Sequence, residues 1–397
     1  MKRKSKVLLV LIAVCAALLF TGTTALADTT VDCPNGAECT THAAAIGSTH
    51  YDTLEEALDA VAASTEQPIV ILNDTTFATA KTIAEGITLT IDLNGKTVIA
   101  SRTITNSGTL TIKDSTAEAD DISGGSGAWK SSVNPAIENY GTLTVDGAKI
   151  TNTSYMAIAT RSSSSVTIKS GTLTGSSYSI YARSGSGAVI DIEKGILNGR
   201  FLGSDVTALN LTIGNYGSAD DTVVINGIVN LKEAHIITVN CGDIKQFSGT
   251  YNPETMQINC KLRNTTSLVL PAGYFLSEGS DDNGVYYTIE VLDEENAGAK
   301  IETAAGDTAF YGDAASAAAA LQTGDKLTIL KEYADTLDIA TEGISIDLGG
   351  NRIDTLEINL STQGKQEGEL AAVSVSNGTV DELIAGTRDS RYYFFLD

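Results

Sequence analysis

The chain has 397 residues, with 26 Lys and Arg against 49 Asp and Glu, which gives a formal net charge of −23 at pH 7. A chain this acidic repels nucleic acid and anionic lipid, so neither is an expected partner. Gly is abundant while Pro and Trp are rare, which is typical of short strands and many turns. The length exceeds what one ordinary core holds, so two units are expected.

The first 27 residues predict an export signal. Four Lys and Arg residues precede an apolar run from Val7 to Phe20, and Ala25-Leu26-Ala27 offers the small-x-small pattern that a signal peptidase cuts. Cleavage after Ala27 would leave 22 basic and 49 acidic residues, a net charge of −27. The mature chain has no apolar stretch long enough to cross a bilayer. The sequence therefore predicts a secreted or cell-surface protein without a transmembrane segment.

Four cysteines follow the signal: Cys33, Cys39, Cys241 and Cys260. An even number in an exported chain predicts disulfides, and the simplest of three connectivities pairs Cys33 with Cys39 and Cys241 with Cys260. The alternative is a zinc site of Cys33, Cys39 and His42, for which the sequence offers no evident fourth ligand. No other metal site and no cofactor is expected.

Two distant segments repeat one pattern. The stretches "YDTLEEALDAV", "PIVIL" and "GITLTIDLNGK", which begin at Tyr51, recur in the same order as "YGDAASAAAAL", "KLTIL" and "GISIDLGGN", which begin at Tyr311. Conserved order with linkers of different length indicates a duplicated unit. In the first copy, Thr53 and Glu56 match a capping box, and an apolar spacing of three and four residues follows from Leu54. This pattern predicts a short helix before two strands.

Between the copies the chain repeats a shorter rhythm. The apolar residues Leu110, Leu143, Val166, Ile190 and Leu211 each lie at the centre of a short strand pattern, at steps of 33, 23, 24 and 21 residues. Short strands at a step near 22 residues, separated by Gly, Asn and Ser, are typical of a parallel β-helix. We therefore expect these five side chains to stack inside one apolar column.

With the segments "TLEEALDAV", "PIVIL" and "TIDLNGKTV", and the N-x-G-T-L-T coils at Asn106 and Asn139, the chain resembles the pectin-lyase-like right-handed parallel β-helix superfamily. It is most similar to the non-catalytic type found in surface proteins of Gram-positive gut bacteria. The resemblance implies an all-β fold in which a short N-terminal helix caps the first coil. The expected parts are a signal peptide at 1–27, a Cys-bearing segment at 28–43, a β-helix with a closing hairpin at 44–291, a linker at 292–299, and a second cap with a partial β-helix unit at 300–397.

Enzymes of that superfamily act on acidic polysaccharides, and the resemblance implies what such chemistry would need. A lyase would need clustered carboxylates beside an Arg or Lys base, and a hydrolase would need paired carboxylates. The available pairs are Asp120-Asp121, Asp220-Asp221 and Asp281-Asp282, all in turn-like contexts, and Arg161, Arg183 and Arg200 recur about one coil apart without an acidic ladder. The pattern favours solvated turn residues, and no catalytic residue is assigned.

One coil is longer than the others because it contains "SGGSGAWKSSVNPAIENY". This insertion carries Trp129, the only Trp of the chain, together with Lys130 and Tyr140. Two interpretations are open: these residues form a loop that contacts a glycan, or Trp129 folds back and covers the apolar column.

Two functions follow from the sequence. The first is an exported, surface-associated β-helix protein that acts in adhesion or glycan binding without catalysis, with a host or microbial glycan or surface protein as its partner. The alternative is a polysaccharide lyase or glycoside hydrolase that acts on acidic polysaccharide. The absent family motifs favour the first.

Overall fold

A computed structural model describes residues 39–61, 67–161, 163–183, 185–202, 206–215, 222–232, 235–271, 273–360 and 373–386. The predicted signal peptide, Cys33, the pair Asp220-Asp221 and the C-terminal "RYYFFLD" lie outside these residues. The chain is nearly all β, with 57% strand and 5% helix, and forms a β-solenoid of about 12 turns and a second sheet unit. The all-β, parallel β-helix prediction is confirmed. By internal packing the chain divides into residues 1–210 and 211–397, which are described separately.

The described elements of the 1–210 unit are β1 (Ala44–Ile46), β2 (Thr49–Tyr51), α2 (Leu54–Asp59), β3 (Ile69–Ile71), β4 (Thr75–Phe77), β5 (Lys81–Ile83), β6 (Thr88–Asp92), β7 (Thr97–Ala100), β8 (Ile104–Asn106), β9 (Thr109–Lys113), β10 (Ala128–Ser131), β11 (Ile137–Asn139), β12 (Thr142–Asn152), β13 (Met156–Thr160), β14 (Ser165–Ala182), β15 (Gly185–Ile192), β16 (Gly195–Leu202) and β17 (Val206–Ile213), whose last three residues belong to the second unit.

The described elements of the 211–397 unit are β18 (Val223–Asn230), β19 (Ile236–Val239), β20 (Asp243–Thr250), β21 (Met256–Ile258), β22 (Lys261–Asn264), β23 (Leu268–Val269), β24 (Tyr274–Asp281), β25 (Gly284–Val291), β26 (Ala299–Glu302), β27 (Thr308–Tyr311), α3 (Ala314–Ala320), β28 (Lys326–Ile329), β29 (Tyr333–Ile339), β30 (Ile344–Asp347), β31 (Arg352–Asn359), β32 (Val373–Ser376) and β33 (Thr379–Gly386).

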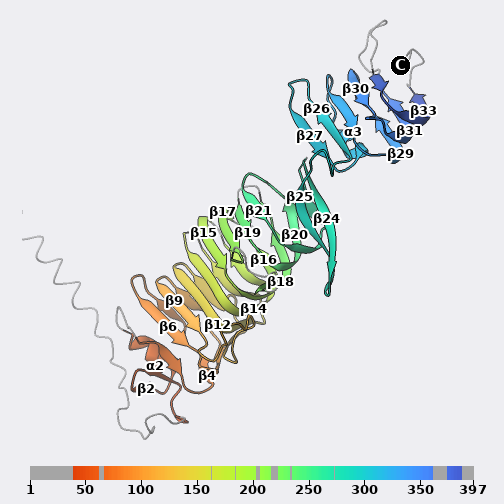
Figure 1. Cartoon of the computed structure of the whole chain (residues 1–397). Helices are drawn as coiled ribbons and strands as arrows, with labels where there is room; N and C mark the ends of the chain where they lie inside the picture. Colours follow the sequence, from red (N-terminus) through yellow and green to blue (C-terminus); the bar gives the residue numbers. More distant parts are fainter. Residues whose placement is uncertain are drawn as a thin grey trace, which may run out of the picture. The chain divides into compact units, whose positions relative to one another are not determined.

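Successive coils of the first unit stack as parallel strands in register, as β6, β9 and β12 illustrate in Figure 1. One apolar position recurs in every coil and is occupied by Leu89, Leu110, Leu143, Val166 and Ile190, each paired with the next. All five side chains are buried, as is Leu211 in the second unit. The predicted column is confirmed from Leu110 to Ile190, whereas the stacking of Leu211 on Ile190 stays a prediction. The column forms because one coil can bury this face only against its neighbours.

A second column inside the coils is polar. The side-chain amide of Asn106 donates to Oδ1 of Asn139 (2.7 Å) and to the carbonyl of Thr142 (2.9 Å). The amide of Asn139 in turn donates to the carbonyls of Gly141 (3.1 Å) and Ser165 (2.9 Å), and both asparagines have no solvent exposure. The N-x-G-T-L-T repeat therefore encodes an asparagine ladder that satisfies turn carbonyls one coil at a time.

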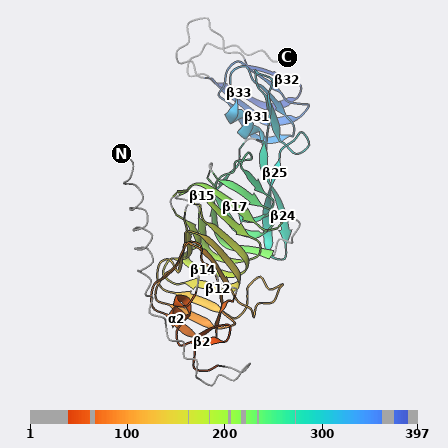
Figure 2. The same cartoon turned by 90° about the vertical axis from the view of Figure 1, so that its left-hand side faces the viewer.

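The first coil is closed by a cap of β1, β2 and α2, which lies at the end of the coil stack (Figures 1 and 2). The predicted capping box is present: the Thr53 side chain accepts from the Glu56 backbone and the Glu56 carboxylate accepts from the Thr53 backbone. Leu54 and Ala57 are fully buried. Glu55 accepts two backbone N–H groups from the loop after β4, at 2.6 and 2.9 Å, which fixes the helix to the next coil.

The predicted duplication is visible as a second cap with the same pairings. β1 lies antiparallel to both β2 and β3, and β26 lies antiparallel to both β27 and β28. The carbonyl of Ile71 accepts from the side chain of Asn94 (3.2 Å), and the carbonyl of Ile329 accepts from that of Asn351 (2.9 Å). The alignment of the two copies within the sequence did not include the strands β1 and β26, because each is only three or four residues long.

The second unit contains the expected hairpin and a short solenoid. β24 and β25 pair antiparallel from Tyr274–Val291 to Asp281–Gly284. After the second cap, β28, β30 and β32 stack parallel, and so do β29, β31 and β33. This supports the partial β-helix reading of the 300–397 segment, whereas its boundary at 292–299 stays a prediction.

Replacing Asn139 by Ala should lower the free energy of unfolding by about 1–3 kcal/mol, because buried carbonyls and the Asn106 amide lose their partner. Chemical denaturation of both proteins measures the difference. Asn283→Ala, at the exposed hairpin tip, is the control and should change stability by no more than about 0.5 kcal/mol. Equal effects of the two substitutions would contradict the structural role of the ladder.

Candidate functional site

The extra residues of the long coil lie between β9 and β10, and Trp129 lies on β10, the regular second strand of that coil. Strand β10 lies parallel between β7 and β12, where Trp129 pairs with Val98 on one side and Ile150 on the other. The Trp129 side chain has no solvent exposure, and its ring lies 5.4 Å from that of Phe77. The glycan-stacking interpretation of Trp129 is therefore wrong, because neither ring face is accessible. The column-covering interpretation agrees with the structure.

Asp114 holds the extra residues of this coil against its surface. Its Oδ1 accepts from the backbone of Gly95 (2.8 Å) and from the backbone and hydroxyl of Thr116 (3.1 and 2.9 Å), and its Oδ2 accepts from the backbone of Gly127 (2.5 Å). The carboxylate is almost fully buried. Lys130 points outward from β10 and is exposed, so the three predicted ligand-binding residues do not form one site.

Tyr140 belongs to a different surface, formed by equivalent turns of consecutive coils. The backbone N–H groups of Tyr140, Arg161 and Arg183 each donate to a carbonyl of the preceding coil, those of Asn106, Asn139 and Thr160, at 2.7, 2.9 and 2.8 Å. The three side chains therefore leave successive coils at the same position. Tyr140 is 47% exposed, and the guanidinium of Arg161 lies 5.5 Å from the centre of its ring.

Glu138 couples the two arginines. Its Oε1 accepts from Nε of Arg161 at 3.1 Å and contacts Nη2 of the same group, and Nη1 of Arg183 lies 4.0 Å away. Partial burial opposes the charge of Arg161, but the hydrogen bond and charge of Glu138 more than offset it, so the pKa of Arg161 is raised. Arg161 therefore stays cationic at neutral pH.

Three tyrosines continue this surface. The ring of Tyr178 lies 5.2 Å from that of Tyr155 and 5.0 Å from that of Tyr181. Tyr155 is 37% exposed, and Tyr178 pairs with the exposed Arg200 of the next coil at an irregularity of the ladder. The hydrogen bond and charge of Tyr178 raise the pKa of Tyr155, so its hydroxyl stays protonated at neutral pH. We name Tyr140, Tyr155, Tyr178, Tyr181, Arg161, Arg183 and Arg200 the Tyr–Arg face.

Sequence reasoning found only part of this face. It noted Tyr140 and the coil-length spacing of the three arginines, but not Tyr155, Tyr178 and Tyr181. Tyr155 and Tyr178 are 23 residues apart, which is the same coil step, so this spacing was the available signal. Tyr181 could be added only from the structure, which brings its ring to 5.0 Å from that of Tyr178.

One member of each Asp pair within the described residues has structural partners. Asp121 is solvent-exposed and accepts from the backbone and hydroxyl of Ser123 at 2.8 and 2.7 Å, which lowers its pKa. Asp281 accepts from Arg263 (3.0 and 3.1 Å) and Lys261 (3.0 Å), and these hydrogen bonds hold the pKa of Asp281 well below its ordinary value. A carboxyl group with a lowered pKa is a poor general acid.

The cysteines differ in part from the predicted pairing. Cys241 and Cys260 are both buried thiols in the structure, so their predicted disulfide is absent. Val239 pairs with Ile258, and the two cysteines follow in stacked turns. Parallel stacking keeps equivalent Cβ atoms about 4.8 Å apart, whereas a disulfide needs about 3.8 Å.

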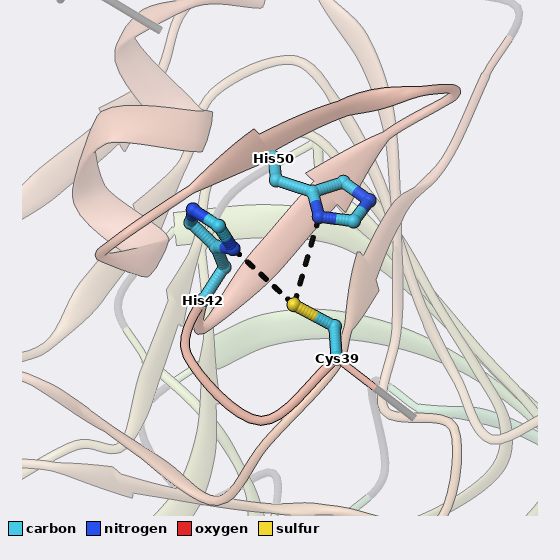
Figure 3. Close-up of side chains that lie close together, drawn as sticks. All are labelled: Cys39, His42 and His50. Carbon is cyan, nitrogen blue, oxygen red and sulfur yellow. Dashed lines mark hydrogen bonds between the residues drawn. The ribbon is translucent and has the colours of Figure 1, made fainter. Parts of the chain in front are cut away.

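Cys39 is disulfide-bonded, and its predicted partner Cys33 lies outside the described residues. The sulfur of Cys39 belongs to a cluster with His42 and His50, whose ligand atoms all lie within 4.8 Å of one another (Figure 3). Sequence reasoning named Cys39 and His42 but missed His50. The signal was the Gly47-Ser48 turn, which returns the chain as an antiparallel strand and places His50 opposite Ala45.

No protein-family model matches the chain, and neither the curated proteins nor the solved structures contain a significant match. Within the described ranges, no helix is long and apolar enough to cross a membrane.

Truncating Trp129 to Ala should lower the free energy of unfolding by about 3–5 kcal/mol, since the buried ring leaves a cavity beside Phe77. Trp129→Phe should cost less, because it keeps a ring and removes an indole N–H that has no hydrogen-bond partner. Thermal and chemical denaturation test both. A Trp129→Ala protein as stable as the parent would contradict the core placement.

Asp281→Asn should lower stability at neutral pH, and the difference from the parent should shrink as the pH falls below about 4. The sign follows from the lowered pKa: the ionised form stabilises the fold above the pKa of the unfolded state, and this contribution is lost on acidification. Melting temperatures across pH measure it, with the exposed neighbour Asp282→Asn as the matched control. A constant difference at every pH would contradict the ion-pair account.

Proposed function

We propose that the protein is exported and, at the cell surface or as a secreted protein, binds glycans that carry carboxylate groups, without catalysis. The single observation that carries this proposal is the Tyr–Arg face, which joins exposed aromatic rings to cationic side chains on consecutive coils. The resemblance to non-catalytic, pectin-lyase-like surface proteins of Gram-positive gut bacteria agrees with it, as does the export signal expected at residues 1–27.

The tyrosines suit the apolar faces of sugar rings. A pyranose presents C–H groups that pack on an aromatic ring, while its hydroxyls bond to polar groups at the edge. Tyr140 and Tyr155 are the most exposed rings of the face. The ring of Tyr178 limits the movement of Tyr155, and the guanidinium of Arg161 limits that of Tyr140. Rings already fixed by their neighbours lose little conformational entropy when a ligand binds.

The arginines select for negative charge. A guanidinium forms two parallel hydrogen bonds with a carboxylate, which a neutral sugar cannot accept in the same way. Arg183 and Arg200 are the better candidates for direct contact, because Arg161 already bonds to Glu138. Their cationic charge is notable in a chain of net charge −23, which repels polyanions elsewhere.

Lyase activity is the alternative, and it would require an Arg or Lys base. A base must lose its proton near the working pH, so its pKa has to be lowered. The pKa of Arg161 is raised instead, through its bond and attraction to Glu138 that offset its partial burial. This observation favours binding over proton abstraction at this face.

Binding of an oligouronate, followed by titration calorimetry, tests the proposal. Tyr155→Ala should weaken binding by several-fold to about tenfold, the loss of one stacked ring. Arg183→Ala should weaken it by about tenfold to a hundredfold, the loss of a charge-assisted contact, and added salt should reduce the affinity. The matched control is Arg352→Ala, an exposed arginine of the second unit.

The same oligosaccharide with its carboxyl groups reduced to alcohols should bind more weakly than the acid. Equal binding of the acid and the alcohol, or unchanged binding by both variants, would contradict the proposal. Absorbance from unsaturated sugar ends, produced during incubation with the acid and lost in Arg161→Ala, would instead establish the lyase.

A further inference from the structure

The cluster of Cys39, His42 and His50 in the first cap is independent of the Tyr–Arg face. Cys39 and His42 lie in the loop before β1, and Asn73 fixes this loop by donating to the carbonyls of Cys39 (2.6 Å) and His42 (2.8 Å). His50 lies on β2, which returns beside β1. The backbone therefore holds all three side chains in place before any ligand binds.

The three ligand atoms of the cluster lie close enough to bind one metal ion, all within 4.8 Å of one another. The sulfur of Cys39 lies 3.2 Å from Nδ1 of His42 and 3.6 Å from Nδ1 of His50 (Figure 3). Around a tetrahedral zinc ion with ordinary Zn–S and Zn–N bonds, a sulfur and a nitrogen ligand lie about 3.6 Å apart. Cys39 and His42 are buried, so the ion would be shielded from water on that side.

The surroundings of His42 also suit a ligand. Oδ1 of Asp52 lies 3.8 Å from Nε2 of His42, the nitrogen that faces away from the sulfur. A carboxylate behind a ligating histidine orients the ring and strengthens its donor nitrogen. The Thr41 hydroxyl lies 3.1 Å from Nδ1 of His42 and would have to rotate away when a metal binds.

We propose that, when Cys39 is reduced, its thiolate binds a zinc ion together with Nδ1 of His42 and Nδ1 of His50. The Cys39 sulfur is disulfide-bonded in the structure, and the same sulfur atom can bind a metal ion only after the disulfide is reduced. A phosphine reductant reduces the disulfide: it transfers two electrons to the sulfur atoms, takes up the oxygen of water to become a phosphine oxide, and leaves two thiols. Zinc then displaces the thiol proton of Cys39, and water fills the fourth tetrahedral position.

Cobalt binding to the reduced, desalted protein tests the proposal. One Co²⁺ per chain should bind, with a thiolate-to-cobalt band in the near ultraviolet and intense visible bands of tetrahedral cobalt, and zinc should abolish both. The disulfide form should show neither band. The matched control is Cys241→Ser, which removes a buried thiol of the second unit and should leave the spectrum unchanged.

Cys39→Ser should remove the thiolate band. His50→Gln should keep the thiolate-to-cobalt band but weaken the affinity for Co²⁺. Loss of a group that only hydrogen-bonds to a metal ligand costs tenfold to a hundredfold in metal affinity, and loss of the ligand His50 itself should cost more. Because His50 is only partly buried, this variant keeps the test valid if Cys39→Ser does not fold. Absence of both bands in the reduced protein, the same bands in the disulfide form, or loss of the thiolate band in Cys241→Ser would overturn the proposal.

Discussion

Parallel, in-register stacking of coils is the constraint on which the rest of the structure depends. It forces each residue to lie beside its equivalent one coil later, so residues of one chemical type at equivalent positions form a column along the stack. The apolar column from Leu89 to Ile190 buries what a single coil would expose. The asparagines at 106 and 139 satisfy turn carbonyls by the same geometry. A stack of this kind needs an end, and the caps at β1 and β26 provide two.

The same constraint explains how much of the fold the sequence could predict. Residues that repeat at the coil step, such as Leu110 and Leu143, could be assigned to the column because burial there is periodic. Trp129 could not be assigned, because the insertion interrupts the period and β10 is recognisable only from its pairing with β7 and β12. The predicted Cys241–Cys260 disulfide was wrong for a related reason: closeness along the chain does not give the separation of two stacked Cβ atoms.

The candidate sites also contain residues that periodic spacing predicted and residues that only the structure revealed. The arginines at 161 and 183 could be placed on one face from their spacing. The contacts of Glu138 with Arg161 and of Tyr181 with Tyr178 depend on side-chain geometry, which spacing does not contain. His50 depends on a hairpin that brings two distant positions together. Local periodicity therefore predicts the columns, and contacts between columns require the structure.

The central functional claim is that the Tyr–Arg face binds a carboxylated sugar. The most direct measurement is a crystal structure of the protein with a uronic acid oligosaccharide. The account predicts a sugar ring packed on Tyr155 or Tyr140 and a carboxylate within hydrogen-bond distance of Arg183 or Arg200. A sugar bound on another surface of the protein, with the Tyr–Arg face empty, would contradict it.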